Sequence, residues 1–142
     1  VYAGGGRSPC TNTILKKDQP PTISPTIIPE KEISQKLGEP MLETIKTSME
    51  PKLFDQKKAD NTNEYFSKHW LEFVEPLREK MLDYDLIWNS MGECGALRTP
   101  EDAKLDSNFY KDALRYGRFI RDRYTILDLA GDSNQLDNLV NV

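Results

Sequence analysis

The chain has 142 residues, enough for one domain of ordinary size with its own core. Its 19 basic and 23 acidic residues give a net charge of −4, and they are mixed, without the basic stripe that marks a nucleic-acid partner. No uninterrupted apolar run approaches the length of about 18 residues that a membrane-spanning helix needs. We therefore expect a soluble protein or subunit with no nucleic-acid partner and no membrane span.

The cysteines and the amino-terminal charges indicate little chemistry. Cys10 and Cys94 lie far apart and form no metal or redox spacing, so we expect two free thiols. The first acidic residue is Asp18, and three basic residues precede it. A basic, acid-free start is typical of a trimmed mitochondrial presequence. This pattern favours a mitochondrial location, with the cytoplasm as the alternative.

Residues 1–30 are predicted to form an extended arm. Six of the nine prolines lie within the first 40 residues, and each removes a backbone donor and disfavours helix at the residue before it. The arm has no core of its own. Two interpretations stay open: a disordered tail, or an arm that lies in a groove of a partner through three apolar residues, Ile23, Ile27 and Ile28.

Residues 31–60 are predicted to contain short helices and a connector. The first helix lies in KEISQKLGEP and is stopped by Gly38 and Pro40. The second lies in PMLETIKTSMEP, and four residues share one helical face there: Met41, Leu42, Ile45 and Met49. A polar connector, DQKKADN, completes this segment.

A helical domain is predicted over residues 61–142, and its best helix starts at Thr62 as the N-cap. Apolar residues recur at steps of three and four and form one stripe: Phe66, Trp70, Phe73, Val74, Leu77 and Met81. Pro76 lies inside this stripe and should kink or restart the helix, because it leaves a carbonyl unpaired. A further short helix, about residues 85–91, is expected to end at Gly92.

The last third of the chain carries two more helix-start signals. In RTPEDAKL, Thr99 is a predicted N-cap and Pro100 the first helical residue. Asp106 or Ser107 caps the next helix, and four positions are expected on one face: Phe109, Ala113, Tyr116 or Gly117, and Ile120. A final apolar group ends at Gly131. No stretch alternates with period two, so the predicted fold class is all-α, a small helical bundle preceded by an extended Pro-rich N-terminal arm.

The candidate reactive residues lack the companions that chemistry needs. His69 has Glu72 in helical reach but no second histidine or cysteine, so it is interpreted as structural or exposed. Cys94 has no basic neighbour in sequence to activate it. The glycine cluster from Gly4 to Gly6 follows no strand, and a flexible terminus is the favoured interpretation. We therefore expect no catalytic, cofactor-binding or metal-binding residue, and no cofactor.

Arg121, Asp122 and Arg123 admit two interpretations. A pair of guanidinium groups near a helix junction could hold a phosphate. It could equally anchor one helix to carboxylates of its neighbour, and without a companion site this structural interpretation is favoured.

Residues 91–132 resemble the extreme C-terminal region of sn-glycerol-1-phosphate dehydrogenases, in the iron-containing alcohol dehydrogenase and dehydroquinate synthase-like superfamily. GALRTPEDAKLD matches a loop that introduces a helix in that family, and GRFIRDRYTILDL matches the segment that closes the family's chain. A looser likeness extends back through EYFSKHWLEFVEPLREKM, so the resemblance covers about residues 62–132, or half the chain.

The resemblance implies a fold of which most is missing here. Family members hold NAD(P) in an N-terminal α/β domain and a divalent metal in a helical domain, and they reduce dihydroxyacetone phosphate. Neither the aspartate and two histidines that bind the metal nor the dinucleotide loop has a match in this chain. The resemblance therefore implies a helix-packing signature without catalysis, made of Arg121, Asp122, Arg123, Tyr124, Ile126, Leu127 and Leu129.

The predicted function is a non-catalytic accessory or structural subunit of a larger complex, a pseudoenzyme derived from a dehydrogenase helical domain, with mitochondria as the candidate compartment. Its partners would be other protein subunits. The alternative is the C-terminal fragment of a split or cleaved NAD(P)-dependent sn-glycerol-1-phosphate dehydrogenase, whose cofactor and metal sites lie on another chain. A third interpretation is a small helical interaction domain whose likeness to the family is accidental.

Overall fold

The computed structural model describes residues 14–140, and within that range the chain is helical and has no strand. The predicted all-α class is confirmed. No described helix combines the length and the apolar composition needed to cross a membrane. The predictions that concern Cys10 and the glycine cluster at residues 4–6 fall outside the described residues.

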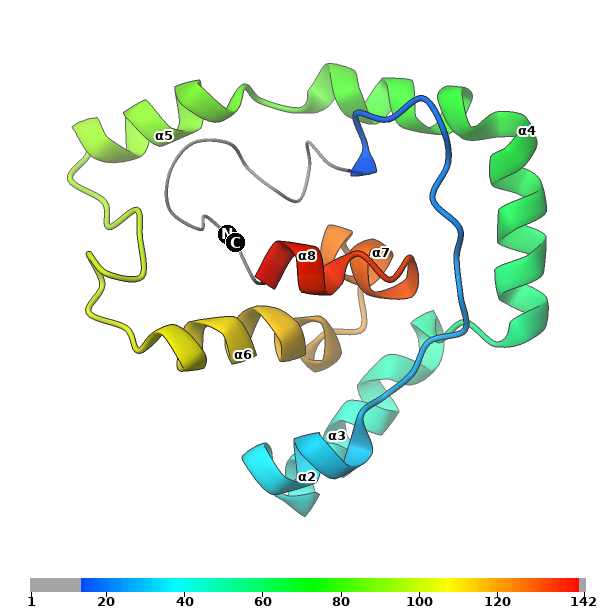
Figure 1. Cartoon of the computed structure of the whole chain (residues 1–142), viewed down its shortest axis with the longest axis horizontal. Coiled ribbons are helices and arrows are strands. Elements are labelled where there is room, and N and C mark those ends of the chain that lie inside the picture. The colour runs from blue at the N-terminus through cyan, green and yellow to red at the C-terminus, as the bar shows by residue number, and fades with distance from the viewer. Residues whose placement is uncertain (1–13, 141–142) are drawn as a thin grey trace.

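The helices form an open frame with a smaller group of helices inside it. In Figure 1, α4, α5 and α6 run around the outside, α7 and α8 lie within, and α2 and α3 project at one corner. The elements in chain order are α2 (Glu30–Leu37), α3 (Glu39–Met49), the 3-10 turn η1 (Glu50–Lys52), α4 (Gln56–Lys80), α5 (Tyr84–Glu93), α6 (Ser107–Gly117), the 3-10 turn η2 (Arg118–Ile120), α7 (Ile126–Asp132) and α8 (Leu136–Val140).

Helices α2 and α3 form as the sequence predicts. Gly38 separates them with a positive φ of 85°, which a residue with a side chain would adopt only under strain, and Pro40 follows in the first turn of α3. Of the predicted apolar face, Met41 is exposed while the other three residues are buried. One core cluster joins these helices to the end of α6 and to η2: Ile33, Leu42, Ile45, Met49, Tyr116 and Phe119.

Helix α4 begins earlier than predicted. Asp55 is its N-cap and accepts a hydrogen bond from the Lys58 amide at 2.7 Å, so the expected polar connector is the first turn of the helix. Thr62 lies inside the helix, and its hydroxyl donates to the Lys58 carbonyl at 2.8 Å. Ala59, in the supposed connector, is completely buried. The prediction of a helix start at Thr62 is therefore wrong by about two turns.

The bend in α4 lies at His69 and not at Pro76. His69 has φ −128° and ψ 16°, and α4 turns a sharp corner in Figure 1. Just beyond this corner, the Trp70 indole nitrogen donates to the carbonyl of Lys17 at 2.9 Å. The Arg78 guanidinium donates to the carbonyl of Leu15 at 2.7 Å. Residues of the arm thus hold the second half of α4 against the molecule.

The described part of the arm packs against the chain's own helices. Ile23 is 3% exposed, and its backbone N–H and C=O pair with the side-chain amide of Asn63 at 2.7 and 2.8 Å. Ile28 packs against the cluster around α3, and Ile27 is 81% exposed. Ile23 is therefore not available to a groove on a partner, whereas Ile28 is half-buried and partner binding through Ile27 and Ile28 stays a prediction. The second core cluster contains Ile14, Leu15, Ile23, Ala59, Phe66, Trp70, Val74, Leu129 and Ala130.

Two predicted details between α5 and η2 are wrong. Thr99 and Asp102 exchange the hydrogen bonds of a helix cap, but the turn ends at Lys104, whose φ is 53°. In α6, capped by Asp106, the expected face is wrong for Phe109 and Ile120, which are 62% and 57% exposed, and correct for Tyr116, which is 5% exposed. The buried face includes Leu114 and Tyr116 and continues into Arg118 and Phe119 of η2.

Candidate functional site

A buried ion pair lies where η1 meets the start of α7. The Lys52 ammonium is 2.8 Å from Oδ1 of Asp128, and the two side chains are 4% and 1% exposed. Lys52 also donates to the backbone carbonyls of Arg118 at 2.6 Å and Arg123 at 3.3 Å. The other oxygen of Asp128 accepts from the amide and the hydroxyl of Thr125, which caps α7.

A second buried pair continues this network toward the arm. Nη2 of Arg118 donates to Oδ1 of Asp132, and both residues are nearly inaccessible. Oδ1 of Asp132 also accepts from the Thr26 hydroxyl at 3.1 Å, and Oδ2 accepts from the Tyr124 hydroxyl at 3.1 Å. The Asp132 carbonyl accepts from the Ser24 amide at 2.7 Å. We call Lys52, Arg118, Asp128 and Asp132, with Thr26 and Tyr124, the ionic network.

The arrangement of the ionic network fits a role in holding segments of the chain together and offers no group for catalysis. It balances two cations against two anions, and each carboxylate oxygen already accepts a hydrogen bond within the chain. A general base needs an oxygen or nitrogen that can reach a substrate proton. The network instead connects the arm, η1, η2 and α7. Buried charges are tolerated only when they are paired, so these four segments must keep their relative positions.

Gly131 leaves the space that Arg118 occupies. A Cβ at this position would lie 1.2 Å from Nη1 of Arg118, so no side chain fits while the guanidinium stays where it is. The glycine that the sequence suggests as a helix stop is therefore inside α7, where it allows close approach of the arginine.

The structure places the residues of the predicted packing signature at different depths, and Tyr124 is 41% exposed. Leu129 is buried and Ile126 packs against the core, while Leu127 is half-buried. Arg121, Asp122 and Arg123 are exposed, and over residues 14–140 they form no ion pair. The arginine that anchors the helix is Arg118, which sequence reasoning missed. One signal was present: Asp128 and Asp132 are four residues apart, on one face of α7.

Two tyrosine hydroxyls donate to carboxylates. Tyr116 donates to Glu32 at 2.7 Å, and burial together with this carboxylate raises the pKa of Tyr116 from 10.0 to about 12. Burial, and next the charge of Asp132, raise the pKa of Tyr124 as well, although part of its ring is exposed. Both shifts disfavour the phenolate.

These shifts predict late-ionising tyrosines. Because the folded-state pKa of Tyr116 is above 10.0, the stability it contributes is complete below pH 10.0 and is lost as the pH rises toward about 12. We expect an alkaline absorbance titration of the folded protein to show one tyrosine, Tyr116, that ionises near pH 12. Tyr116→Phe should remove it, and Tyr65→Phe, at an exposed position, should not. An unchanged titration in Tyr116→Phe would contradict the assignment.

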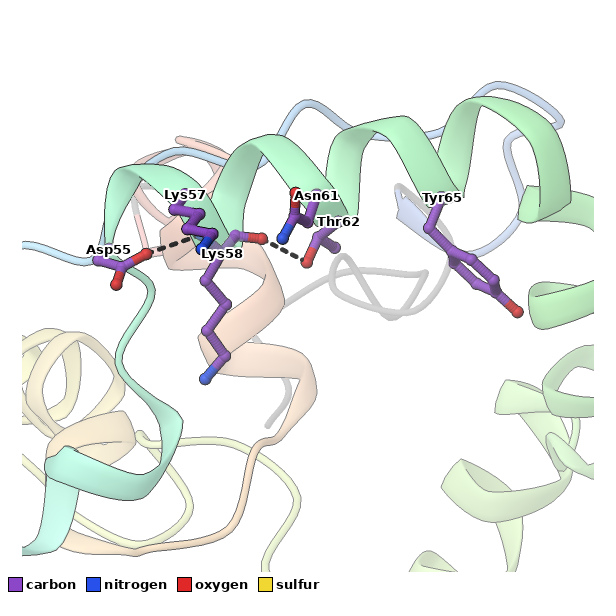
Figure 2. Close-up of a pocket in the computed structure, with 6 residues that line it drawn as sticks. All are labelled: Asp55, Lys57, Lys58, Asn61, Thr62 and Tyr65. Carbon is purple, nitrogen blue, oxygen red and sulfur yellow. Dashed lines mark hydrogen bonds between the residues drawn. The ribbon is translucent and has the colours of Figure 1, made fainter.

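An open hollow follows the first turns of α4 (Figure 2). Its volume is about 330 Å³, and it is lined by Asp55, Lys57, Lys58, Asn61, Thr62 and Tyr65. Its polar groups serve the helix start: Asp55 caps it, Thr62 bonds to the Lys58 carbonyl, and the Lys58 ammonium donates to Leu53 at 3.0 Å. The hollow therefore brings together no catalytic set.

A second cavity, of about 430 Å³, lies beside the ionic network. Its lining is mixed: Ile27, Pro29, Glu32, Arg115, Arg118, Phe119, Gly131, Asn134, Leu136 and Asp137. Each charged group has a partner within the chain, since Arg115 pairs with Asp137 at 2.9 Å and Glu32 accepts from Tyr116. Arg118 pairs with Asp132. The cavity is therefore balanced in charge and favours no charged ligand.

His69 and Cys94 lie in separate surroundings. Nδ1 of His69 is 3.0 Å from the Glu72 carboxylate, as the helical spacing predicts, and the imidazole stacks on Tyr65 with 4.8 Å between ring centroids. Cys94 is a free, exposed thiol. Within residues 14–140, no three His, Cys, Asp or Glu side chains converge in a way that could hold a metal ion.

The segment from residue 82 to residue 109 exposes large apolar side chains. None of the residues of α5 is buried. Leu82 is 68% exposed and Leu86 is 57% exposed, although long apolar side chains are normally covered in a folded domain. The full set of exposed large apolar residues in this segment is Leu82, Leu86, Leu97, Leu105 and Phe109. We call residues 82–109 the open segment.

Fold and site together define a class: an all-α domain with a buried ionic network and a segment that exposes large apolar side chains. No protein-family model matches the sequence, and no curated protein and no solved structure is similar to it. The relationship to glycerol-1-phosphate dehydrogenases therefore stays a prediction from the quoted motifs.

Proposed function

We propose that this chain is a non-catalytic subunit that joins other protein subunits in a larger assembly through the open segment. The observation that carries the proposal is the exposure of Leu82 and Leu86 just before and within α5, a helix that buries no residue, together with the exposure of Phe109 at the start of α6. Contiguous exposed apolar surface marks interaction sites in folded proteins, and the proposal takes these side chains to form one such surface.

The ionic network supports a structural role for the rest of the chain. Four charged side chains of the network hold α7, η1 and the arm in place. Each carboxylate oxygen of the network already accepts a hydrogen bond within the chain.

The alternative is the C-terminal piece of a split NAD(P)-dependent dehydrogenase. It predicts that the open segment packs on a larger chain that carries a dinucleotide loop and two metal-binding histidines. The accessory subunit instead predicts a partner without these motifs. A mitochondrial site for either assembly is part of the proposal and is tested by cell fractionation.

Site-specific photo-crosslinking in the native cells tests the proposal. A photoreactive phenylalanine analogue replaces Leu86 in α5, and in a matched strain it replaces Leu71, which is 44% exposed on α4. We expect a discrete covalent adduct with another protein from position 86 and none from position 71. Equal adducts from both positions, or no adduct from position 86, would overturn the proposed function. The sequence of the crosslinked partner distinguishes the accessory subunit from the piece of a split dehydrogenase.

A further inference from the structure

We propose that the partner segment seated on the open segment is a basic amphipathic helix. The inference rests on the proposed function, which gives the open segment as the docking surface, and it adds the chemistry of what docks there.

The excess negative charge of the chain lies within the open segment. The open segment contains six acidic residues (Asp83, Asp85, Glu93, Glu101, Asp102 and Asp106) and two basic ones (Arg98 and Lys104), so its net charge is −4. This equals the net charge of the whole chain, and the remaining residues hold 17 acidic and 17 basic side chains. The excess negative charge therefore lies in the same segment as the exposed apolar residues.

Over residues 14–140, no described ion pair involves an acidic residue of the open segment. The Arg98 guanidinium lies over the Trp88 ring, 4.8 Å from its centroid, and donates to the Trp88 carbonyl at 3.3 Å. The Asp102 carboxylate accepts from the backbone amides of Arg98 and Thr99, which lowers the pKa of Asp102 and keeps it ionised. Asp83 likewise accepts from backbone amides at the start of α5. The charge of Arg98 also contributes to the lowered pKa of Asp102, but neither acid forms an ion pair among those that the structure describes for residues 14–140.

A basic amphipathic helix fits the open segment better than a second copy of this chain or an anionic lipid surface. A second copy of this chain seated through the same segment would bring two surfaces of charge −4 together, and like charges across an interface cost binding energy. A lipid surface of anionic composition would be repelled for the same reason. A helix with an apolar stripe between lysine or arginine rows satisfies both features, because it covers the leucines and pairs with the acids.

The test uses the full chain and two labelled peptides followed by fluorescence anisotropy. One peptide has leucines at i, i+3, i+4 and i+7 with lysine elsewhere, and the other has glutamate in place of lysine. We expect the lysine peptide to bind at least about tenfold more tightly than the glutamate peptide, with binding weakened as salt is raised to about 0.5 M.

Paired variants identify the surface. Asp85→Asn with Glu93→Gln removes two charges from the open segment, and Glu43→Gln with Glu50→Gln removes two from exposed positions around α3. We expect the first pair to weaken lysine-peptide binding at least about threefold and the second to leave it unchanged. Circular dichroism confirms that each variant stays helical.

The outcomes separate this inference from the proposed function. Equal weakening by both variant pairs, equal binding of both peptides, or no binding of the lysine peptide overturns the inference. So does a dimer in sedimentation that Leu86→Ser dissociates, since the occupant is then a second copy. A specific crosslink from position 86 to another protein would still support the proposed function in each of these cases.

Discussion

Asp128→Asn is expected to lower the free energy of unfolding by about 3–5 kcal/mol. The substitution keeps the shape of the side chain and an oxygen for the Thr125 amide, but it removes the charge that faces the Lys52 ammonium at 2.8 Å. Lys52 is 5% exposed and would be left as a buried cation. Since the free energy of unfolding of a domain of this size is about 5–15 kcal/mol, much of its stability would be lost. Chemical denaturation measures the change.

Asp137→Asn is the matched control. Asp137 pairs with Arg115 at 2.9 Å, but its side chain is 76% exposed, so we expect a loss below about 1 kcal/mol. A double-mutant cycle of Asp128→Asn with Lys52→Met isolates the pair and should give a coupling of about 1–3 kcal/mol. Equal small losses at Asp128 and Asp137 would show that the ionic network does not hold the fold.

Gly131→Ala is expected to cost about 2 kcal/mol or more, although it adds only one methyl group. The new Cβ would lie 1.2 Å from Nη1 of Arg118, so the guanidinium must move away from Asp132. Arginine is flexible, but this one is 5% exposed, and its displacement leaves a buried carboxylate with fewer donors. Thermal unfolding measures the loss.

Gly117→Ala provides the opposite expectation. Gly117 ends α6 with φ −58° and ψ −26°, and a Cβ there meets nothing within 4 Å. The alanine should stabilise the protein by up to about 1 kcal/mol, because it restricts the unfolded chain and favours helix. If both alanines stabilise, the close approach of Arg118 to Gly131 is not part of the folded state.

Periodicity and capping chemistry predict the all-α class and the positions of α2, α3 and α5 closely. The start of α4 could not be placed from periodicity, because its first turns are polar. Asp55 was the available signal, since an aspartate three residues before the Lys58 amide is as good an N-cap as Thr62. The bend at His69 depends on tertiary contacts of Trp70 and Arg78 with the arm, which a local pattern does not contain.

The ionic network was predictable only in part. The spacing of Asp128 and Asp132 places both carboxylates on one face of α7, but the choice of Arg118 over Arg121 depends on η2 turning the chain back across that helix. Lys52 comes from a segment 76 residues away, and nothing in its neighbourhood indicates burial. Similarly, proline content predicts the extended arm but not that Ile23 packs inside the chain's own core.

Native mass spectrometry of the gently purified full chain tests the central claim most directly. We expect a complex of defined mass with another protein, lost in Leu86→Ser on the open segment and kept in Leu71→Ser on α4, with both variants equally stable. Recovery of the unaltered chain as a free monomer, or a complex that Leu86→Ser leaves intact, would contradict the claim that the open segment is the surface by which this protein joins its assembly.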